Sequence, residues 1–550
     1  MQKYGELLGT LLKKRGIRTE AEAEIFLKPD YRRDLYDPYL MRDMERACVR
    51  LYEAVENKEK IIIYADYDCD GIPGAVILED LFRLVSFKNF EVYIPKRNIE
   101  GYGLNVEAVK QFAESGAKLL ITIDLGITAI AEVAQAEVDG MDVIITDHHL
   151  PPEVLPKAYA ILNPKTDEYP EKMLAGAGVM FKFAQAFVKK YGEYFKIKDD
   201  AEKWMLDMAG LATLADMVPL LGENRALAYF GLKVLRRSPR PGLQKLLANL
   251  GIDQKYLSED DVTFSITPRL NAASRMDDPR RAYELLTTLD EGRAGVLAEH
   301  LSRINDERKA MVAGIMREVK KNFEKREMRE IIVVGNPKWR VGVLGLVAGK
   351  ISDEYARPVF VWGKDESDSI RGSCRSDGSV SVVELMTETR EYFIEYGGHE
   401  LAGGFSVHTD KIHFLEEALA SNFSKVRRNT NLNTNINYDI KSDLGVVTMK
   451  TWDEIQKLAP YGLGNPKPVF LFEKVKVENI KKFGKNGGEH LEISFIDSLG
   501  NKAKAVSFFS HGDSFTGPVG VGFYVNLLAN LDLSRYRGRE ELRLRVVDII

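Results

Sequence analysis

The sequence predicts an α/β protein in which a parallel sheet is followed by a long helix, a second α/β unit and a C-terminal antiparallel β-barrel. Three observations support this fold class. Apolar, β-branched runs in the first 150 residues end in acids and histidines, a charged helical stretch spans residues 279–329, and short alternating segments follow residue 461. Runs that are apolar throughout are typical of strands buried on both faces of a parallel sheet.

Three apolar runs define the first sheet. They cover residues 60–65, 119–123 and 143–146, and polar residues follow each of them directly. The stretches between them, such as AVILEDLFRLVS and NVEAVKQFAESG, have the spacing of crossover helices. Strands that alternate with helices predict a sheet that is covered by helices on both faces.

The rest of the chain divides at changes in pattern. The charged helical stretch is expected to bridge two domains, and REIIVVG at 329–335 opens the second α/β unit. The segment RRNTNLNTNIN at 427–437 has no periodicity and is typical of a linker. Short strands separated by turns then predict a small OB-like barrel. The predicted domains are 1–225 (catalytic, with an N-terminal extension), 226–328 (helical connector), 329–426 (second α/β), 427–438 (linker) and 439–550 (barrel).

Composition limits the function. The 550 residues include 77 Lys and Arg against 82 Asp and Glu, a formal net charge of -5, with 45% hydrophobic residues. These values exclude a fibrous or wholly disordered chain. They disfavour a general nucleic-acid coat, but they permit a local basic groove or carboxylates that hold cations. Three scattered cysteines, no signal-peptide pattern and no apolar run of membrane-spanning length predict a cytoplasmic protein without a membrane partner.

Acids and histidines gather where the predicted strands end. Ligands of parallel sheets bind beyond the carboxyl ends of the strands, so these side chains are expected to lie close together. So many carboxylates would repel one another unless cations neutralised them. Asp216 is added to this set although it follows an apolar helix end rather than a strand, because burying an unpaired acid there would cost free energy. The set comprises Asp66, Asp68, Asp70, Asp124, Asp147, His148, His149 and Asp216.

Each motif alone has a simpler interpretation. Asp-x-Asp-x-Asp-Gly is often a turn or a calcium loop, although position twelve counted from Asp66 is Ile77 rather than the bidentate Glu of that loop. A histidine pair is often a surface feature. Three strand ends together predict a metal site, and oxygen and imidazole ligands favour Mn²⁺, with Mg²⁺ acceptable. The number of ligands predicts two cations, which serve phosphoester hydrolysis.

Four motifs resemble those of the DHH phosphoesterase family. They are DYDCDG (66–71), Asp-Leu-Gly (124–126), TDHH (146–149) and LADMVPL (214–220). Five further segments resemble the bacterial single-strand-specific exonucleases of the DHH/DHHA1 family. These are LLKKRGIRTEAEAEIFLKPD (11–30), TPRLNAASRM (267–276), GSCRS (372–376), GGHELAGGF (397–405) and PYGLGNPKPVF (460–470).

The resemblance implies a DHH domain, a long helix, a DHHA1 domain that faces the first across a cleft, and an OB-fold that feeds in single strands. It implies that two Mn²⁺ or Mg²⁺ ions are bound, that Asp124 bridges them, and that Asp147 orients a histidine. The implied ligands, which would also be the catalytic residues, are Asp66, Asp68, Asp70, Asp124, His148, His149 and Asp216.

A second group of residues is implied to bind substrate phosphate. Gly397, Gly398 and His399 lie in a glycine-rich turn, where backbone N–H groups can hold an anion. Ser373 and Arg375 would hold the same or the next phosphate, and Arg269, Asn271 and Arg275 would contribute from the connector. Without the resemblance, the glycine turn could serve packing alone and Arg375 could be a solvated charge.

Three positions depart from the family pattern. Tyr64 lies where pyrophosphatase-like relatives place a metal-binding histidine, and Ser274 replaces a common glycine. Arg340-Val341 follows Trp339 where relatives often carry His-Glu, so the role of this loop stays open. In the barrel, basic and aromatic residues are candidates for single-strand binding or for a solvated edge. They are Lys481, Lys482, Lys485, Arg535, Tyr536, Arg537 and Arg539.

The predicted function is a 5′ to 3′ single-stranded-DNA exonuclease that yields mononucleotides, in DNA repair and recombination. One alternative is a DHH phosphodiesterase for oligoribonucleotides or cyclic dinucleotides, although such enzymes lack the barrel. Another is a non-catalytic DNA-binding subunit, against which the complete set of acids and histidines weighs. We expect a monomer whose partners are single-stranded DNA and a single-strand-binding protein or a helicase.

Overall fold

The computed structural model describes residues 2–97, 100–324, 327–365, 367–428, 437–484, 490–508, 510, 514–536 and 539–550. The chain divides into two compact units. The larger comprises Pro38–Asp216 and Val234–Asn433, and the smaller comprises Met1–Asp37, Met217–Lys233 and Thr434–Ile550. No helix within the described ranges is long and apolar enough to cross a membrane.

Five parallel strands form the first sheet of the larger unit, in the order β2-β1-β3-β4-β5. Ile63 pairs with Ile121, which pairs with Ile144 on the next strand. The predicted runs become the three central strands, and two short strands extend the sheet at its edges. The bounds are β1 (Lys60–Ala65), β2 (Phe90–Tyr93), β3 (Ala117–Ile123), β4 (Asp142–Thr146) and β5 (Ala160–Leu162).

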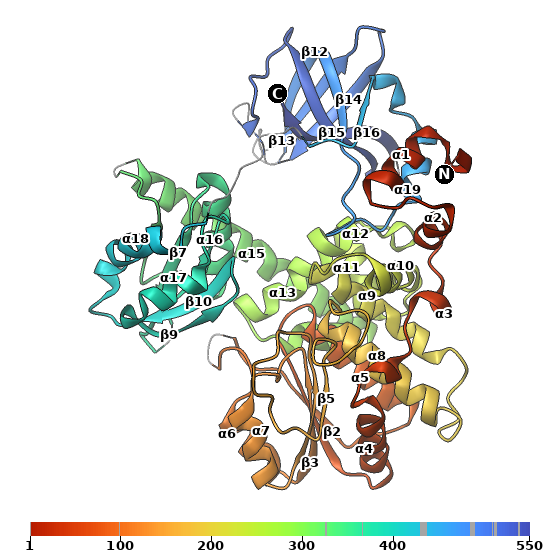
Figure 1. The fold of residues 1–550 in the computed structure, drawn as a ribbon, viewed down its shortest axis with the longest axis vertical. Coiled ribbons are helices and arrows are strands. Elements are labelled where there is room, and N and C mark those ends of the chain that lie inside the picture. The colour runs from red at the N-terminus through yellow and green to blue at the C-terminus, as the bar shows by residue number, and fades with distance from the viewer. Residues whose placement is uncertain are drawn as a thin grey trace. The chain divides into compact units, whose positions relative to one another are not determined.

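Helices cover both faces of this sheet (Figure 1). On one face, Val109 and Phe112 of α6 and Val133 of α7 share a core with Ile62 and Leu120. On the other face, α5 packs against α8 and α9, and α4 packs against α8. The bounds are α4 (Met44–Glu56), α5 (Gly71–Leu84), α6 (Val106–Glu114), α7 (Ile130–Val138), α8 (Gly176–Tyr191) and α9 (Leu206–Ala215).

A set of helices connects the first sheet to the second. The charged helical stretch 279–329 is interrupted just before Glu291, where the Asp290 side chain accepts a hydrogen bond from Arg293 N at 2.5 Å and so caps the long helix. A π-helical turn, Val262–Ile266, leads into α13. The bounds are α11 (Pro241–Leu250), α12 (Glu259–Asp261), α13 (Thr267–Met276), α14 (Arg280–Thr287) and α15 (Glu291–Phe323), while the preceding helix α10 (Gly222–Leu235) belongs mostly to the smaller unit.

The second sheet has the order β6-β7-β8-β10-β9. β6 and β7 run parallel, and the other neighbours pair antiparallel. One face packs on α17 and α18, and the other packs on α16 and the end of α15. The bounds are β6 (Ile332–Gly335), α16 (Val341–Tyr355), β7 (Val359–Lys364), β8 (Ile370–Arg375), α17 (Val382–Glu388), β9 (Phe393–Gly398), β10 (Ala402–Val407) and α18 (Leu415–Val426).

The smaller unit contains a closed barrel. Its strand order is β11-β12-β13-β14-β16-β15, and pairing of β12 with β15 closes it. The predicted antiparallel pairing holds for most neighbours, while β14–β16 and β11–β12 run parallel. The bounds are β11 (Ile440–Ser442), α19 (Met449–Gln456), β12 (Phe470–Phe483), β13 (His490–Ile496), β14 (Lys502–Phe508), β15 (Tyr524–Tyr536) and β16 (Arg539–Ile549).

The N-terminal helices belong to the core of the barrel. Leu8, Leu11 and Leu12 of α1 are buried in one core with Phe470 and Phe472. The sequence placed this segment with the catalytic domain because its periodicity predicts an apolar face but not the core on which that face packs. The helices are α1 (Gly5–Lys14), α2 (Glu20–Leu27) and α3 (Tyr31–Asp34). Most of the predicted linker, residues 429–436, lies outside the described residues.

Candidate active site

The first acidic loop follows β1 and leads into α5. A Cβ at Gly71 would lie 2.5 Å from the Asp66 carbonyl oxygen, so the tight turn requires glycine there. Asp68 Oδ1 accepts hydrogen bonds from the N–H groups of Asp70 (2.8 Å) and Gly71 (3.2 Å). Asp70 accepts two more, at 2.6 and 2.7 Å, from the first two residues of α8. The loop thereby holds three carboxylates at the carboxyl edge of the sheet.

Asp124 follows β3 in a left-handed conformation, with φ of 62°. Such a backbone is strained for a residue other than glycine. A Cβ at Gly176, the first residue of α8, would lie 2.7 Å from Asp124 Oδ1, so the helix approaches this aspartate as closely as glycine allows. Asp124 Oδ1 is buried and accepts no hydrogen bond from the described residues, and the same holds for Asp66 Oδ1. Buried carboxylate oxygens without donors suit a cation.

Asp147 follows β4 and orients the second histidine. Its Oδ1 accepts hydrogen bonds from His149 Nδ1 (2.8 Å) and from the N–H groups of His148 (2.7 Å) and His149 (3.0 Å). Burial would raise the pKa of Asp147, but the hydrogen bonds and the charge of His149 bring it below the usual value. Burial would lower the pKa of His149, whereas Asp147 raises it. The two side chains therefore form an ion pair.

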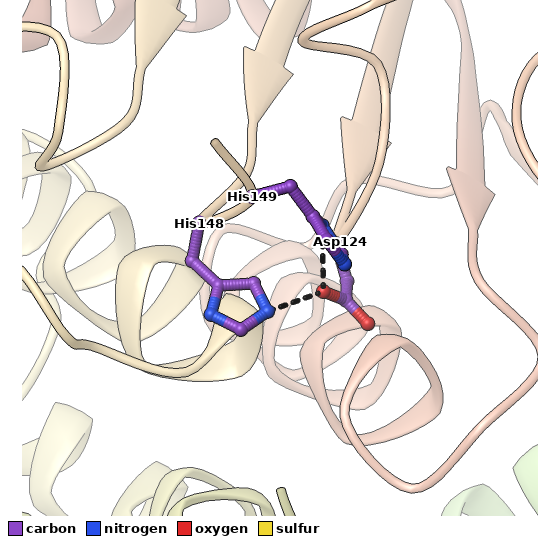
Figure 2. A group of neighbouring side chains, drawn as sticks. All are labelled: Asp124, His148 and His149. Carbon is purple, nitrogen blue, oxygen red and sulfur yellow. Dashed lines mark ion pairs between the residues drawn. The ribbon is translucent and has the colours of Figure 1, made fainter. Parts of the chain in front are cut away.

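His148 points from the same strand end to Asp124 (Figure 2). Its Nε2 lies 3.2 Å from Asp124 Oδ1, 3.7 Å from Asp70 Oδ2 and 3.8 Å from Asp216 Oδ2. Burial, together with the neighbouring charge of His149, lowers the pKa of His148 to about 4. The ring is therefore neutral at pH 7, which is the state that binds metals.

The ligand atoms form three overlapping groups, each within 4.8 Å. Asp124 and His148 are each shared by two of them, so the groups form one continuous site. The predicted ligand residues are thus brought together, and Asp147 lies behind them. The groups are Asp124, His148 and His149; Asp70, His148 and Asp216; and Asp66, Asp68 and Asp124.

The electrostatics of this site are unfavourable without cations. Burial, and then neighbouring aspartates, raise the pKa of Asp66 and Asp124 well above the usual value. The same causes raise the pKa of Asp70 to about 7 and that of Asp216 to about 8. Divalent cations would reverse these shifts, because they favour the ionised carboxylates. The donor set and its charge therefore fit divalent cations.

Tyr102 is a site residue that sequence reasoning missed. Its hydroxyl donates to the Asp124 carbonyl oxygen at 3.2 Å and lies 3.2 Å from His149 Nδ1. The flanking Gly101 and Gly103 both have positive φ, 82° and 95°. In the sequence, the motif Gly101-Tyr102-Gly103 indicates a turn that presents an aromatic residue, and Tyr102 could have been found from this signal.

The connector brings unsatisfied polar groups together on α13 and α15. Arg269 and Asn271, predicted from the sequence, have buried atoms without hydrogen-bond partners among the described residues, and so do Ser302, Asn305 and Arg308 on α15. Each such atom is costly unless a ligand or water satisfies it. The helical pattern of α15 gives no sign that a polar residue such as Asn305 is fully buried. These three residues were therefore missed.

Arginines in the same region repel one another. Burial, then Arg97 and Arg308, lower the pKa of Arg275 to about 9. Burial and Arg269 lower the pKa of Arg308. Arg97 also lowers the pKa of Arg375, after the larger effect of burial. A phosphate would relieve this repulsion.

The second sheet contributes a row of small residues. Ser373 of β8 is opposite Gly404 of β10, which is opposite Gly397 of β9. Gly398 has φ of 139°, and a Cβ there would lie 2.4 Å from the Ala402 carbonyl oxygen. Side chains alternate along strands, so Arg375 shares the face of Ser373.

His399 connects the two groups of predicted residues. Its ring stacks with that of His149, with a centroid distance of 6.5 Å and an angle of 9°. The phosphate-binding candidates on the second sheet thus lie next to the metal-binding candidates on the first.

In the smaller unit, an aromatic patch accompanies the predicted basic residues. Phe483, His490 and Phe508 contact one another with centroid distances of 5.1 to 6.4 Å, and Arg543 and Arg545 lie over Phe508. Lys481 and Lys482 lie on β12, and Arg535 pairs with Glu540. Lys485 and Arg537 lie outside the described residues, as do the side chains of Tyr536 and Arg539.

Three family profiles match the chain. They are the DHH family N-terminal domain over residues 60–215, the DHHA1 domain over 328–425 and the RecJ OB domain over 438–548. The single-stranded-DNA-specific exonuclease RecJ of Bacillus subtilis is 35% identical and aligns with 98% of this chain and 67% of its own length. That of Haemophilus influenzae is 30% identical over 98% of this chain and 95% of its own. The chain belongs to the RecJ family.

Solved RecJ structures agree with this assignment. RecJ from Thermus thermophilus in complex with Mn²⁺ has a TM-score of 0.80 at 26% identity, covering 99% of this chain and 75% of the other. The same protein in complex with Mg²⁺ has a TM-score of 0.75 at 25% identity, covering 99% and 74%. The predicted fold class and the predicted DHH/DHHA1 family are confirmed, and the chain is a metal-dependent nuclease of the RecJ type.

Proposed function

We propose that the chain hydrolyses single-stranded DNA from a 5′ end to mononucleotides, in DNA repair and recombination. The observation that carries the proposal is the convergence of three strand ends and Asp216 around Asp124 Oδ1 and His148 Nε2. Members of the RecJ family are named single-stranded-DNA-specific exonucleases, which supports the substrate. The polarity rests on the family resemblance.

Two divalent cations, Mn²⁺ preferred or Mg²⁺, are proposed to bind at this site. Buried carboxylate oxygens without donors among the described residues and a neutral His148 support them. When bound, such ions activate water and stabilise the leaving oxygen of a phosphoester. The residues that would hold these ions are Asp66, Asp68, Asp70, Asp124, His148, His149 and Asp216, and Asp124 would be the residue shared between the two.

The other residues of the chain orient these ligands and the strand. Asp147 would fix the ring of His149 through the 2.8 Å hydrogen bond to its Nδ1. Tyr102 holds the Asp124 carbonyl oxygen. Arg269, Asn271 and Arg275 would bind substrate phosphates, together with the α15 residues Ser302, Asn305 and Arg308.

The terminal phosphate is proposed to bind at the second sheet. Backbone N–H groups near Gly397 and Gly398 and the side chains of Ser373, Arg375 and His399 would hold it. The stacking of His399 on His149 supports a short distance between this phosphate and the bond that is cut. A short distance favours release of one nucleotide per turnover.

The barrel is proposed to bind the strand farther from its end. A cluster of aromatic rings next to arginines is typical of single-strand binding without base readout, because bases can stack on the rings. This patch favours long DNA over the alternative substrates, oligoribonucleotides and cyclic dinucleotides.

Organisation and partners remain proposals as well. We retain the boundaries 1–225, 226–328, 329–426, 427–438 and 439–550 for the DHH domain, connector, DHHA1 domain, linker and barrel, although the contacts of α1 join it to the barrel core. A monomer in the cytoplasm is proposed, acting with a single-strand-binding protein or a helicase, because such partners produce or hold the single strands that this site would degrade.

A labelled-strand assay tests the function. With Mn²⁺, a 3′-labelled single strand should shorten progressively, a 5′-labelled strand should release labelled mononucleotide at once, and duplex DNA and RNA should persist. EDTA should stop the reaction, and His148→Ala should abolish it while the circular dichroism spectrum is unchanged. Intact single strands with every metal would refute the nuclease, and immediate release from a 3′ label would reverse the polarity.

A further inference from the structure

The loop between β6 and α16, residues 336–340, is fixed to the long helix α15. Glu318 of α15 accepts hydrogen bonds from Asn336 Nδ2 at 2.9 Å and from Trp339 Nε1 at 3.0 Å. The Trp339 side chain is buried. The sequence left the role of this loop open. In the structure, Asn336 and Trp339 fix the loop to the connector helix α15 rather than to the active site.

Arg340 extends from the same loop to the end of α13. Its Nη2 donates a hydrogen bond to the carbonyl oxygen of Met276, the last residue of that helix, at 2.7 Å. Carbonyl groups in the last helical turn lack partners within the helix, and a cation there interacts favourably with the helix dipole. A residue of the second α/β unit therefore caps the helix that carries Arg275.

The backbones of α13 and α16 meet next to this cap. A Cβ at Gly342, in the first turn of α16, would lie 2.4 Å from the Arg275 carbonyl oxygen. Arg275 Nη1 in turn donates to the Gly342 carbonyl oxygen at 3.3 Å. The position of Arg275 is therefore set by where α16 begins.

One turn further along, α16 contacts the phosphate-binding candidates of β8. A Cβ at Gly345 would lie 3.2 Å from Arg375 Nη2 and 3.5 Å from Ser373 Oγ. The first two turns of α16 thus lie between Arg275 on one side and the Ser373–Arg375 pair on the other.

We propose that Arg340 is a positioning residue which, by holding the end of α13 against the start of α16, sets the spacing between Arg275 and the Ser373–Arg375 pair and so the affinity for a 5′-terminal phosphate. The inference rests on the proposed function in one respect, that these residues bind this phosphate. It adds an element that touches neither the strand nor the metal ligands.

The test compares Arg340→Ala with Arg340→Lys, which can still donate to one carbonyl group, and with Arg390→Ala, which removes an exposed arginine elsewhere in the same α/β unit. KM and kcat are measured with Mn²⁺ on a single strand bearing a 5′-phosphate and on the same strand with a 5′-hydroxyl. Arg340→Ala should raise KM for the phosphorylated strand about three- to tenfold, the size expected for the loss of one exposed hydrogen bond. It should leave kcat and the hydroxyl strand nearly unchanged. Arg340→Lys should restore most of the loss, and Arg390→Ala should change neither strand.

Hydrogen exchange provides a second readout that does not depend on the substrate. Arg340→Ala should accelerate exchange of the amides in the last turn of α13, whereas Arg390→Ala should not. Unchanged exchange, or equal changes in KM on both strands, would overturn the inference. If the wild-type enzyme does not distinguish the two strands, the phosphate site itself is refuted. Accelerated exchange in Arg340→Ala would then show that Arg340 positions α13 for another purpose, and the inference as stated would also be overturned.

Discussion

His149 donates a hydrogen bond from Nδ1 to Asp147 Oδ1 at 2.8 Å, and Asp147 itself lies outside the three groups of metal-binding candidates. An ionised carboxylate only accepts hydrogen bonds, so His149 carries a proton on Nδ1 and this contact fixes the orientation of its ring. Asp147, the aspartate of the Asp-His-His motif, therefore acts on the site by orienting His149.

Asp147→Asn should weaken Mn²⁺ binding about 10- to 100-fold, the range for partners that orient metal ligands. The amide cannot accept hydrogen bonds on both of its ends, as Asp147 does from His149 and Ile127. Activity as a function of Mn²⁺ concentration measures the effect. Asp142→Asn, at the opposite end of β4, is the control and should leave the Mn²⁺ dependence unchanged. Equal shifts in both variants would contradict the role of Asp147.

Mn²⁺ binding should strengthen as pH rises from about 6 to about 8 and should release protons. Without cations, Asp70 and Asp216 have raised pKa values of about 7 and about 8, so both must lose protons to bind. Calorimetry in two buffers with different ionisation enthalpies counts the protons, and Asp216→Asn should release fewer.

The raised pKa values of Asp70 and Asp216 also predict how stability depends on pH. They mean that the folded metal-free protein holds more protons than the unfolded chain between about pH 4 and about pH 8. Its Tm in EDTA should therefore fall as pH rises, and a Tm that rose over this range would refute the shifts.

Gly176→Ala should damage the metal site without unfolding the chain. The added Cβ would lie 2.7 Å from Asp124 Oδ1, so either Asp124 or the start of α8 must move. The rise in Tm on adding Mn²⁺ should shrink, and about tenfold more Mn²⁺ should be needed for activity. Gly295→Ala, in α15 with open space around it, should instead raise the free energy of unfolding by about 0.4–1 kcal/mol. A normal Mn²⁺ response in Gly176→Ala would show that Asp124 tolerates displacement.

Arg308→Gln should weaken substrate binding and leave stability intact. Arg308 is half-buried, and its guanidinium is close enough to Arg269 and Arg275 for the arginines to repel one another, so removing its charge relieves repulsion in the free protein. KM for a single strand should rise about tenfold, while the midpoint of urea unfolding should stay or increase. Arg317→Gln, an exposed arginine on the same helix, should change neither. Loss of stability with unchanged KM would mean that Arg308 serves packing alone.

The sequence predicted the parts of the fold that local patterns determine. The central strands β1, β3 and β4 were predicted because buried parallel strands have continuous apolar runs. The short edge strand β5, Ala160–Leu162, has too few residues to carry such a signal. The burial of the N-terminal helix α1 in the barrel core with Phe470 depends on packing over a long sequence separation, which local patterns do not reveal.

The residues of the candidate site also divide into those that a local sequence pattern predicts and those that depend on packing. Asp66, Asp124 and His148 could be proposed because the ends of parallel strands meet at one edge whatever the details of packing. Asn305 and Arg308 could not, because their role depends on burial against α13, which the helical pattern of α15 does not reveal. The hydrogen bond of Arg340 to Met276 joins elements from different parts of the chain and likewise has no local signal.

The packing of α1 in the barrel has a consequence for the order of folding. Arg15 donates to the Asn465 side chain 450 residues further along the chain, and the leucines of α1 are buried only when β12 is present. During synthesis, these first helices leave the ribosome long before their partner strands do. The larger unit, built from segments that are closer in sequence, can fold in the meantime, since nearby contacts form with a smaller loss of chain entropy. Maturation of the barrel is therefore the late step, and a chain interrupted before β12 would expose the apolar face of α1 to chaperones and proteases.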